Sequence, residues 1–433
     1  MEKPRMTLLI VAVVVSLVLF FSSVFVFGVT QSSAWHSEKL ADTYNAEYDN
    51  AIAIDSQDGV HVVLASHRYS NSTLDYYRQV DGKWNVTELL SVYNYLTDVS
   101  IALDEHDYLH VCTGQGNSSL TYITNSGGTW TKSYYGLNQS YLSGRIALDA
   151  SGIPGFLCSQ RHPRDDNEST NYKNVTSIVY LRYEEGRWSS SPVLMPFAAQ
   201  FAYVESFSIG SDNALHALIA VWNNSTGYES SPFEYRLVYA TMDAGGWSFY
   251  NLRHDSSPAG RSSLVLDRTN TPHVSYFDTD QSGVVLKYAV KDAYGWNQSV
   301  IEEVGNHWAT TSSIALGPDG APRICFSTIQ NTKGISDNKV SVLFASEISG
   351  TWEEQRVIKP CETREEGADV SLALDSHGIA HVCYGGQDRI MYASNTPNPN
   401  EVRDQLIGAA LLTFPLALAL SGALLVIRFK RIM

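Results

Sequence analysis

Five histidines recur at one position of a repeated sequence pattern, and imidazoles gathered in that way could hold a metal ion. A second interpretation is local: each histidine hydrogen-bonds an acidic partner in its own repeat, as His110 would with Asp104. Residues copied with a repeat usually serve the repeat, and Gly155 and Arg323 replace histidine in two other copies. The local interpretation is therefore favoured over a metal centre. The histidines are His61, His110, His216, His273 and His381.

Two loops, in the third and fourth repeats, gather residue types that bind sugars or peptides. Aromatic rings stack on such ligands, and arginine and carboxylate groups form paired hydrogen bonds with them. Because these repeats are neighbours, we expect the loops to meet on one face. Plain solvent-facing loops are the alternative, and the sequons in the same loops would place glycans there. The candidate ligand-binding residues are Arg161, His162, Arg164, Asp165, Asp166, Trp222, Tyr228 and Tyr235.

A third candidate site is the run Asp278-Thr-Asp280-Gln-Ser282-Gly283, which resembles the first half of a calcium loop. Alternating oxygen ligands before a glycine allow one turn to wrap a hard cation. The bidentate glutamate that completes an EF-hand is absent, because position 12 is Ala289. Calcium is the one cofactor that the sequence suggests, and a solvated turn is the favoured alternative.

The cysteines do not form a disulfide framework. Cys112, Cys325 and Cys383 occupy equivalent second-strand positions, and Cys158 lies one residue away from that position. Equivalent atoms of neighbouring repeats are expected to lie too far apart for a bond that needs Cα atoms within about 7 Å. We therefore expect small buried hydrophobic side chains there, with Cys361 free between repeats.

Three linked signatures recur along the chain and define its architecture. The first is a strand, an Asp-centred turn and a second strand, with six residues from Asp104 to His110; the copy at Ser208–His216 is interpreted as two residues shorter. The second is an apolar-x-aromatic step such as Leu120/Tyr122, and the third pairs Gly with Trp. Each unit reads as four short strands with a period of about 45 to 60 residues. Seven such units predict an all-β, seven-bladed β-propeller.

The predicted ring closes through its two ends. The seventh unit lacks its Trp, whereas Trp35-His-Ser-Glu-Lys-Leu40 matches Trp84-Asn-Val-Thr-Glu-Leu89 in position and type. Residues 35–41 are therefore predicted to be the outer strand of the last blade, within a propeller that spans residues 35–395. Pairing of this kind removes the open edge that a linear array would leave.

The pattern Ser-Ile-Ala-Leu-Asp-x-x-Gly-x-x-His-Val, then Leu-x-Tyr-Ala and Gly-x-Trp, resembles the repeat of exported bacterial and archaeal β-propellers of the sialidase-like group. The resemblance covers residues 35 to about 395. Thr241-x-Asp243-x-Gly245-x-Trp247 is one residue short of the Asp-box turn of sialidases. Because that box is a structural turn, the resemblance implies a fold and no activity.

The sequence leaves three functional classes open. A sialidase-like hydrolase needs an arginine cluster, a tyrosine nucleophile and an acidic partner at the central mouth, and no motif locates such a set. Polysaccharide lyases on related propellers use His, Tyr and Arg, which occur here without a diagnostic spacing. A recognition or scaffold module for a protein or glycan ligand is favoured over a glycan-processing enzyme, and a structural subunit of an envelope assembly is the third class.

Two uncharged segments flank the predicted propeller. Residues 7–29, at about 1.5 Å per residue, can span a bilayer core, and residues 406–427 form a second such run. Basic residues lie on the outer sides of both runs, in a tip at residues 1–6 and in a tail at residues 428–433. A linker at residues 396–405 joins the propeller to the second run. The positive-inside rule places both termini in the cytoplasm and the propeller outside the cell membrane. A signal peptide cleaved after Ala34 is the alternative for the first segment.

Sequons and charge agree with export. Nine Asn-x-Ser/Thr motifs occur where chance predicts about four, as expected of a glycoprotein surface. With a formal net charge of -15 and a pI of about 5.2, the chain lacks the basic footprint of a nucleic-acid binder. The partners expected are the membrane itself and a protein or glycan ligand. The sequons are Asn71, Asn85, Asn117, Asn138, Asn167, Asn174, Asn223, Asn224 and Asn297.

Overall fold

The computed structural model describes most of the region between the two uncharged segments. Both segments, the basic tips and the linker after residue 396 lie outside the described residues. Among the described residues, no helix is long and apolar enough to cross a membrane. The described residues are 35–42, 49–68, 71–80, 82–93, 95–115, 119–136, 140–163, 174–197, 199–224, 233–255, 260–281, 283–305, 308–331, 338–348, 350–357, 361–362, 369–386 and 389–396.

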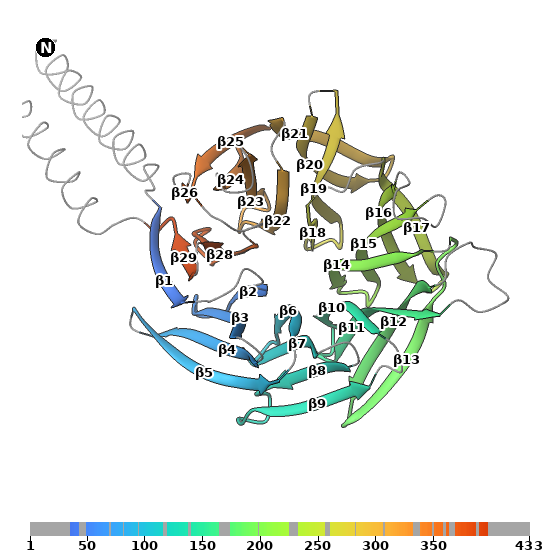
Figure 1. The fold of residues 1–433 in the computed structure, drawn as a ribbon, viewed down its shortest axis with the longest axis vertical. Coiled ribbons are helices and arrows are strands. Elements are labelled where there is room, and N and C mark those ends of the chain that lie inside the picture. Colours follow the sequence, from blue (N-terminus) through green and yellow to red (C-terminus); the bar gives the residue numbers. More distant parts are fainter. Residues whose placement is uncertain are drawn as a thin grey trace, which may run out of the picture. The chain divides into compact units, whose positions relative to one another are not determined.

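Seven antiparallel sheets surround a central channel, and each is one blade of a propeller (Figure 1). The strands of a blade follow one another from the channel outwards, so the innermost strands of all blades run in the same direction. Blade one contains β2 (Asp49–Ile54), β3 (Val60–Arg68), β4 (Asn71–Val80) and β5 (Lys83–Val92). Blade two contains β6 (Leu96–Leu103), β7 (Leu109–Gln115), β8 (Ser119–Thr124) and β9 (Thr131–Gly136). Blade three contains β10 (Ser140–Leu148), β11 (Pro154–Pro163), β12 (Asn174–Glu184) and β13 (Arg187–Val193).

The remaining blades repeat this order, with one short extra strand in blade six. Blade four contains β14 (Phe201–Ile209), β15 (Leu215–Asn224), β16 (Phe233–Asp243) and β17 (Gly246–Asp255), and blade five contains β18 (Ser263–Leu266), β19 (Pro272–Asp280), β20 (Gly283–Asp292) and β21 (Gly295–Gly305). Blade six contains β22 (Trp308–Leu316), β23 (Pro322–Asn331), β24 (Asn338–Ile348), β25 (Thr351–Arg356) and the extra strand β26 (Cys361–Glu362). Blade seven contains β27 (Val370–Leu374), β28 (Ala380–Gly386), β29 (Arg389–Ser394) and β1 (His36–Asp42).

The predicted closure of the ring is confirmed. β1 pairs with β29 as the outer strand of blade seven, so the first and last strands of the propeller share one sheet. The closing strand also contacts blade one, because Nε1 of Trp84 donates to Oε1 of Glu38 at 2.8 Å. Leu40 and Ala41 pack against the core between these two blades.

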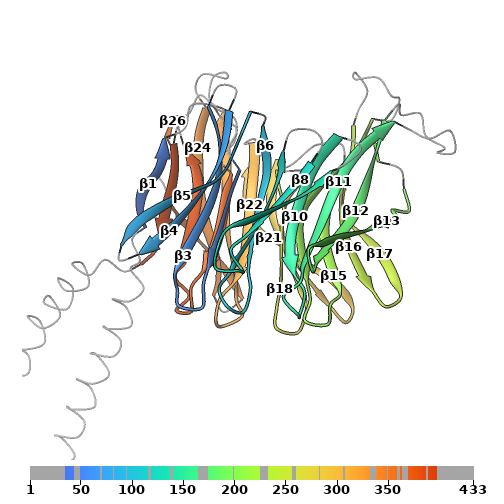
Figure 2. The same cartoon turned by 90° about the horizontal axis from the view of Figure 1, so that it is seen from below.

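The turns between the first two strands of each blade lie on one face of the disc (Figure 2). In five blades an aspartate begins the turn and caps it: Oδ1 of Asp55 accepts the backbone N–H groups of Gln57 at 3.0 Å and Gly59 at 2.6 Å. Such side-chain acceptors replace backbone partners in tight turns. The other four capping residues are Asp104, Asp149, Asp267 and Asp375.

Blades four and six use a shifted cap. Gly210 begins the turn of blade four, and Oδ1 of Asp212 accepts the N–H of Ala214 at 3.1 Å. A Cβ atom on Gly210 would lie 2.4 Å from this oxygen, so a cap from Asp212 requires glycine at the first position. Since Gly210 stands six residues before His216, the expectation that this copy is two residues shorter is wrong. In this copy the capping carboxylate stands two residues later, on Asp212, and the turn keeps its usual length.

Each repeated histidine is held by its own blade. Nδ1 of His110 lies 2.7 Å from the hydroxyl of Tyr122, and the equivalent distance is 2.6 to 2.7 Å in all five copies. Nε2 of His110 faces Asp104 at 3.5 Å, as predicted from the spacing. The predicted acidic partner is thus confirmed for His61, His110 and His381. His273 lies 3.8 Å from Asp267, and Nε2 of His216 has no hydrogen-bond partner among the described residues.

The same tyrosines join one blade to the next. The ring of Tyr122 lies 6.4 Å from that of Trp188, which belongs to the outer strand of the following blade. One side chain therefore connects the histidine of its own blade to the tryptophan of its neighbour, which explains why the three signatures recur together. The other ring pairs are Trp84–Tyr392, Trp130–Tyr76, Trp296–Tyr239 and Trp352–Tyr288.

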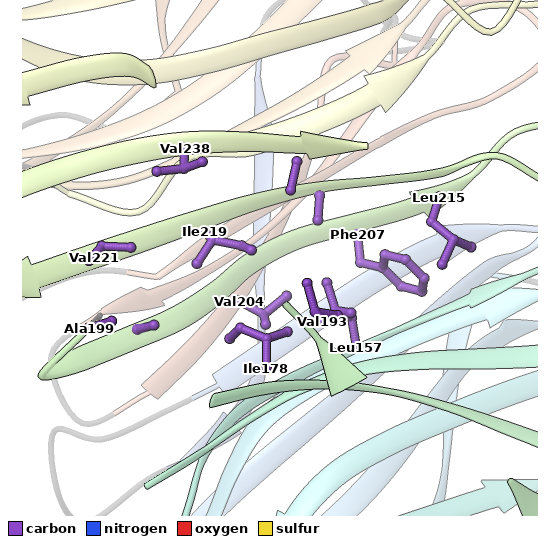
Figure 3. Packing of buried hydrophobic residues seen from close by; sticks show 13 residues of the cluster. Leu157, Ile178, Val193, Ala199, Val204, Phe207, Leu215, Ile219, Val221 and Val238 are labelled. Carbon is purple, nitrogen blue, oxygen red and sulfur yellow. The ribbon is translucent and has the colours of Figure 1, made fainter. Parts of the chain in front are cut away.

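The apolar core lies between the faces of adjacent blades. Figure 3 shows the contact of blades three and four, where Leu157 and Ile178 pack against Val204, Phe207 and Ile219. Apolar burial of this kind supplies the main favourable free energy of folding. Cys112, Cys158, Cys325 and Cys383 are buried and free, as predicted, whereas the side chain of Cys361 lies outside the described residues.

Candidate functional site

The innermost strands carry a repeated serine that ties blades together. Four residues before the start of the turn, the hydroxyl of Ser100 accepts the N–H of Ile146 in the next blade at 3.3 Å. Ser206, Ser263 and Ser313 make the same contact to Leu264, Ile314 and Leu372. Arg145 replaces this serine in blade three and Ala51 does so in blade one. Arg145 is therefore a departure from the repeat at the centre of the molecule.

Charged residues gather in the channel next to this serine ring. Asp49, Asp98, Arg261 and Asp369 stand six residues before the turn in their blades, and Glu205 stands five before it. Together with Arg145 they give four carboxyl groups and two guanidinium groups, and all of these except Asp98 line a cavity of about 280 Å³. Because the innermost strands begin on the face opposite the Asp turns, these charges lie towards that face.

Arg261 connects blades that are not neighbours. Its Nη1 lies 2.9 Å from Oδ1 of Asp49 in blade one and 3.2 Å from Oδ2 of Asp369 in blade seven. Oδ1 of Asp369 also accepts a hydrogen bond from Thr311 at 2.8 Å. The Arg261 side chain keeps 44% of its surface exposed, so water in the channel reaches this group.

A second set of contacts forms around Arg145. Its Nη1 lies 3.1 Å from Oδ1 of Asp98 in blade two, and its Nε donates to the carbonyl of Glu205 in blade four at 3.0 Å. The carboxyl group of Glu205 accepts the backbone N–H of Ser262 at 2.9 Å and also contacts its hydroxyl. The two guanidinium groups thus join the inner edges of six blades.

The four channel carboxyl groups outnumber the two described guanidinium groups, and three of the four carboxyl pKa values are raised. Burial raises the pKa of Asp369 to about 6 against the opposing charge of Arg261, with Asp49 contributing further. Burial also raises the pKa of Asp98 and that of Glu205. Burial would raise the pKa of Asp49 too, but Arg261 lowers it to about 2. An added positive charge would therefore stabilise the ionised forms of three channel carboxyl groups.

An aromatic wall, formed by Phe201, Tyr203 and Trp222, lies in blade four beside Arg161 of blade three. The guanidinium carbon of Arg161, near the end of β11, lies 4.1 Å from the ring centre of Phe201. Trp222 pairs directly with Phe201, and its ring lies 5.8 Å from that of Tyr203. Burial raises the pKa of Tyr203, with Arg161 opposing and Asp98 adding to the rise. Tyr203 thus lies within electrostatic reach of both Arg161 and the channel.

The structure brings together only part of the ligand-binding set predicted from the loops. Arg161 lies over the ring of Phe201, whose cross-strand partner is Trp222. Tyr235 is buried at 3% exposure in the core between blades four and five, and Trp222 packs against that core. Nδ1 of His162 contacts the carbonyl of Pro163 at 3.0 Å. Arg164, Asp165, Asp166 and Tyr228 lie outside the described residues.

The proposed calcium run does not present its first ligand to a cation. Asp278 lies in β19, where its carboxylate is 2.5 Å from Nζ of Lys287 and 3.3 Å from Nε of Arg253. Two positive side chains at this carboxylate would repel calcium, so the geometry does not fit the predicted site. Asp280 pairs with Gly283 across the hairpin, and Ser282 lies outside the described residues.

Another acidic group, at the Asp turns, was not predicted. Oxygen and nitrogen atoms of Asp58, Asp375 and His377 lie within 4.8 Å of one another. Asp58 accepts the N–H and hydroxyl of Ser376 at 2.7 and 2.8 Å, and Asp375 caps its own turn. These bonds explain the cluster as a joint between blades seven and one. The channel carboxyl groups do not form such a close set among the described residues.

The sequons differ in accessibility. Asn71, Asn85 and Asn297 are exposed, whereas Asn223 is 9% exposed and its Oδ1 accepts the N–H of Gln200 at 2.8 Å. Asn223 is thus a poor glycan acceptor in the folded protein. Asn174 is half-buried, and the side chains of Asn117, Asn138, Asn167 and Asn224 lie outside the described residues.

The channel residues belong to no sequence motif and were not predicted: Asp49, Asp98, Arg145, Glu205, Arg261 and Asp369. A usable signal existed, because aligning the repeats on their turns places charges where other copies carry Ser, Thr or apolar residues. The residues that the repeats share predict the fold, whereas the site consists of residues that they do not share.

The fold and its channel define the chain as a closed seven-bladed β-propeller with an asymmetric charged centre. Comparisons with family models and with curated proteins gave no match. Among solved structures, it is similar to an ulvan lyase, with TM-score 0.49, 12% identity and coverage of 85% of this chain and 99% of that one. It is also similar to Trypanosoma rangeli sialidase, with TM-score 0.45, 12% identity and coverage of 87% of this chain and 58% of that one. A protein of unknown function from Dyadobacter fermentans is similar as well, with TM-score 0.45, 13% identity and coverage of 83% of this chain and 98% of that one.

Proposed function

We propose that this protein is a membrane-anchored recognition module of the cell surface, whose central channel binds a cationic group of its ligand. The uncharged runs at residues 7–29 and 406–427, with basic residues on their outer sides, support anchoring with the propeller outside the cell. The exposed sequons Asn71, Asn85 and Asn297 are compatible with that side of the membrane.

The observation that carries the proposal is the excess of carboxyl groups in the channel. Among the described residues of the channel, Asp49, Asp98, Glu205 and Asp369 are opposed by Arg145 and Arg261 alone, and three of the four carboxyl pKa values are raised. Buried carboxyl groups ionise more readily when a cation arrives. A cavity of about 280 Å³, lined by Asp49, Glu205 and Asp369 together with both arginines, suits a lysine or arginine side chain, or another organic amine.

An organic cation fits this channel better than a metal ion does. Calcium requires six to eight oxygen ligands at about 2.3 to 2.6 Å, hence a tightly convergent set of carboxylates. The described channel carboxyl groups do not converge in that way, and Arg261 lies between two of them. An ammonium or guanidinium group can instead bind through a few separate hydrogen bonds.

Isothermal titration calorimetry of the full-length chain in detergent tests this proposal, with Nα-acetyl-lysine amide and Nα-acetyl-arginine amide as probes. Saturable binding at one site is expected, and Asp369→Asn is expected to weaken it at least tenfold. Asp42→Asn, which removes an exposed acid of β1, is the matched control and should bind as the original does. Equal affinity of Asp369→Asn and the original chain would refute the channel as the site.

A glycan-processing enzyme is the alternative, and one observation favours it. Tyr203 and Glu205 stand two residues apart on β14, near the channel and within reach of Arg145 and Arg161. Against it, the carboxyl group of Glu205 is bonded to Ser262, and Arg145 and Arg261 are already paired with aspartates. Turnover of sialosides or polyuronates that is lost in Tyr203→Phe would establish the enzyme; no turnover leaves the recognition module.

A further inference from the structure

We infer that Arg161 and Trp222 form a subsite for an oxyanion, such as a carboxylate, sulfate or phosphate group, where blades three and four border the channel. This inference goes beyond the proposed binding of a cation, because it concerns a different part of the ligand and different residues. It begins from two hydrogen-bond donors that the fold buries without an acceptor.

Nε of Arg161 and Nε1 of Trp222 are both shielded from solvent, and neither has a hydrogen-bond acceptor in the structure as described. Buried donors are nearly always paired in folded proteins, so these two unpaired donors require an explanation. Both residues lie near the ends of their strands, β11 and β15, and Phe201 at the start of β14 links them.

The aromatic rings hold the guanidinium group in a useful orientation. Phe201 lies beneath the guanidinium carbon of Arg161 at 4.1 Å, and Trp222 is the cross-strand partner of Phe201. A guanidinium group stacked on a ring keeps its N–H bonds directed outwards from its edge. That edge is the part that binds an oxyanion through two parallel hydrogen bonds.

The chemistry of these donors selects the ligand. A guanidinium group and an indole N–H both donate and cannot accept, so the complementary group must accept several hydrogen bonds. A negative charge adds attraction to Arg161, which has no described ion-pair partner, whereas Arg145 and Arg261 have carboxylate partners. The subsite therefore favours an oxyanion over a neutral sugar hydroxyl.

Titration of the full-length chain in detergent with sodium acetate, sulfate and phosphate, at ionic strength matched with chloride, tests the inference. The readout is the indole resonance of Trp222 in a proton–nitrogen correlation spectrum, assigned through its loss in Trp222→Phe. A saturable shift of this resonance is expected with at least one of the three anions, and the preferred anion identifies the group. No shift with any of the three would overturn the inference.

Two variants separate a specific subsite from a general effect of charge. Arg161→Gln is expected to weaken anion binding at least tenfold, whereas Arg187→Gln, which removes an exposed arginine of the same blade, should leave it unchanged. Equal loss in both would overturn the inference. Lysine-amide binding should survive Arg161→Gln, and anion binding should survive Asp369→Asn, so failure of one proposal is distinguishable from failure of the other.

Discussion

Nη1 of Arg261 lies 2.9 Å from Oδ1 of Asp49, and this contact joins the innermost strand of blade five to that of blade one across the channel. The two blades are separated by blades six and seven on one side and by three blades on the other. Most contacts between blades join neighbours and follow the repeat. This ion pair does neither, which marks the channel as the place where the seven copies have diverged.

Replacing Arg261 with glutamine should weaken the fold and strengthen binding of cations. Asp49 and Asp369 would lose their shared counter-charge, and because Arg261 is partly exposed we expect a loss of about 1 to 2 kcal/mol rather than the larger value of a fully buried pair. Affinity for Nα-acetyl-lysine amide should rise, since the probe could take the vacated position. Denaturant unfolding and calorimetry measure the two effects; a variant that loses stability and amine binding together would contradict this role.

Binding of the lysine amide should strengthen as pH rises through 6. The bound form needs Asp369 ionised, and burial raises the pKa of this group to about 6, so protons compete with the probe below that pH. Between pH 5 and pH 7 the affinity should increase about tenfold. Calorimetry at several pH values tests this, and in Asp369→Asn the dependence should become weaker, with Asp98 and Glu205 contributing what is left. A flat profile in the original chain would argue against the assignment.

The repeated histidines should make the propeller sensitive to acid. Burial lowers the pKa of each of them, including His110 and His216, so the folded state disfavours their protonated form. Their contribution to stability is present above the unfolded-state pKa of about 6.5 and is lost as pH falls through the folded-state values. His110→Gln should make the free energy of unfolding fall less steeply between pH 7 and pH 5. An unchanged slope would mean that His110 does not titrate on unfolding.

The shifted cap of blade four can be converted to the usual one. Gly210→Asp alone should destabilise the protein, because its Cβ would clash with the carboxylate of Asp212. Combined with Asp212→Ser, it should be neutral or stabilising by about 1 kcal/mol, since the new aspartate can cap the turn and offer a partner to Nε2 of His216. A double-mutant cycle measured by thermal unfolding tests this; additive effects of the two substitutions would contradict it.

The closing strand should be required for a stable ring. Deleting residues 36–42 removes β1, exposes the edge of β29 and takes away the acceptor of Trp84. A large fall in the midpoint of thermal unfolding is expected, together with association through the open edge. Glu38→Gln, which keeps an acceptor for Trp84, serves as the mild control. Unchanged thermal stability after the deletion would refute closure by this strand.

The fold could be predicted from the sequence because its signals repeat. The Tyr122 contacts show why: one ring joins His110 of its own blade to Trp188 of the next, so the three residues tend to recur together. The shifted cap of Asp212 was misjudged because the turn position of a carboxylate depends on the space left by Gly210. Local patterns do not reveal such exchanges within a turn.

The site was harder to predict because its residues meet only after the ring closes. Arg261 and Asp49 are separated by more than half of the propeller in sequence, and neither belongs to a motif. The composition of the loops of blades three and four predicted a ligand-binding site there. Among the residues of those loops, Arg161 and Trp222 remain the best candidates for ligand contact. Tyr235, by contrast, serves the core.

A crystal structure of the full-length chain soaked with Nα-acetyl-lysine amide tests the central claim most directly. We expect the ammonium group in the channel, within hydrogen-bond distance of the carboxyl groups of Asp49, Asp369 or Glu205. A lysine amide bound elsewhere, with the channel filled by water alone, would contradict it.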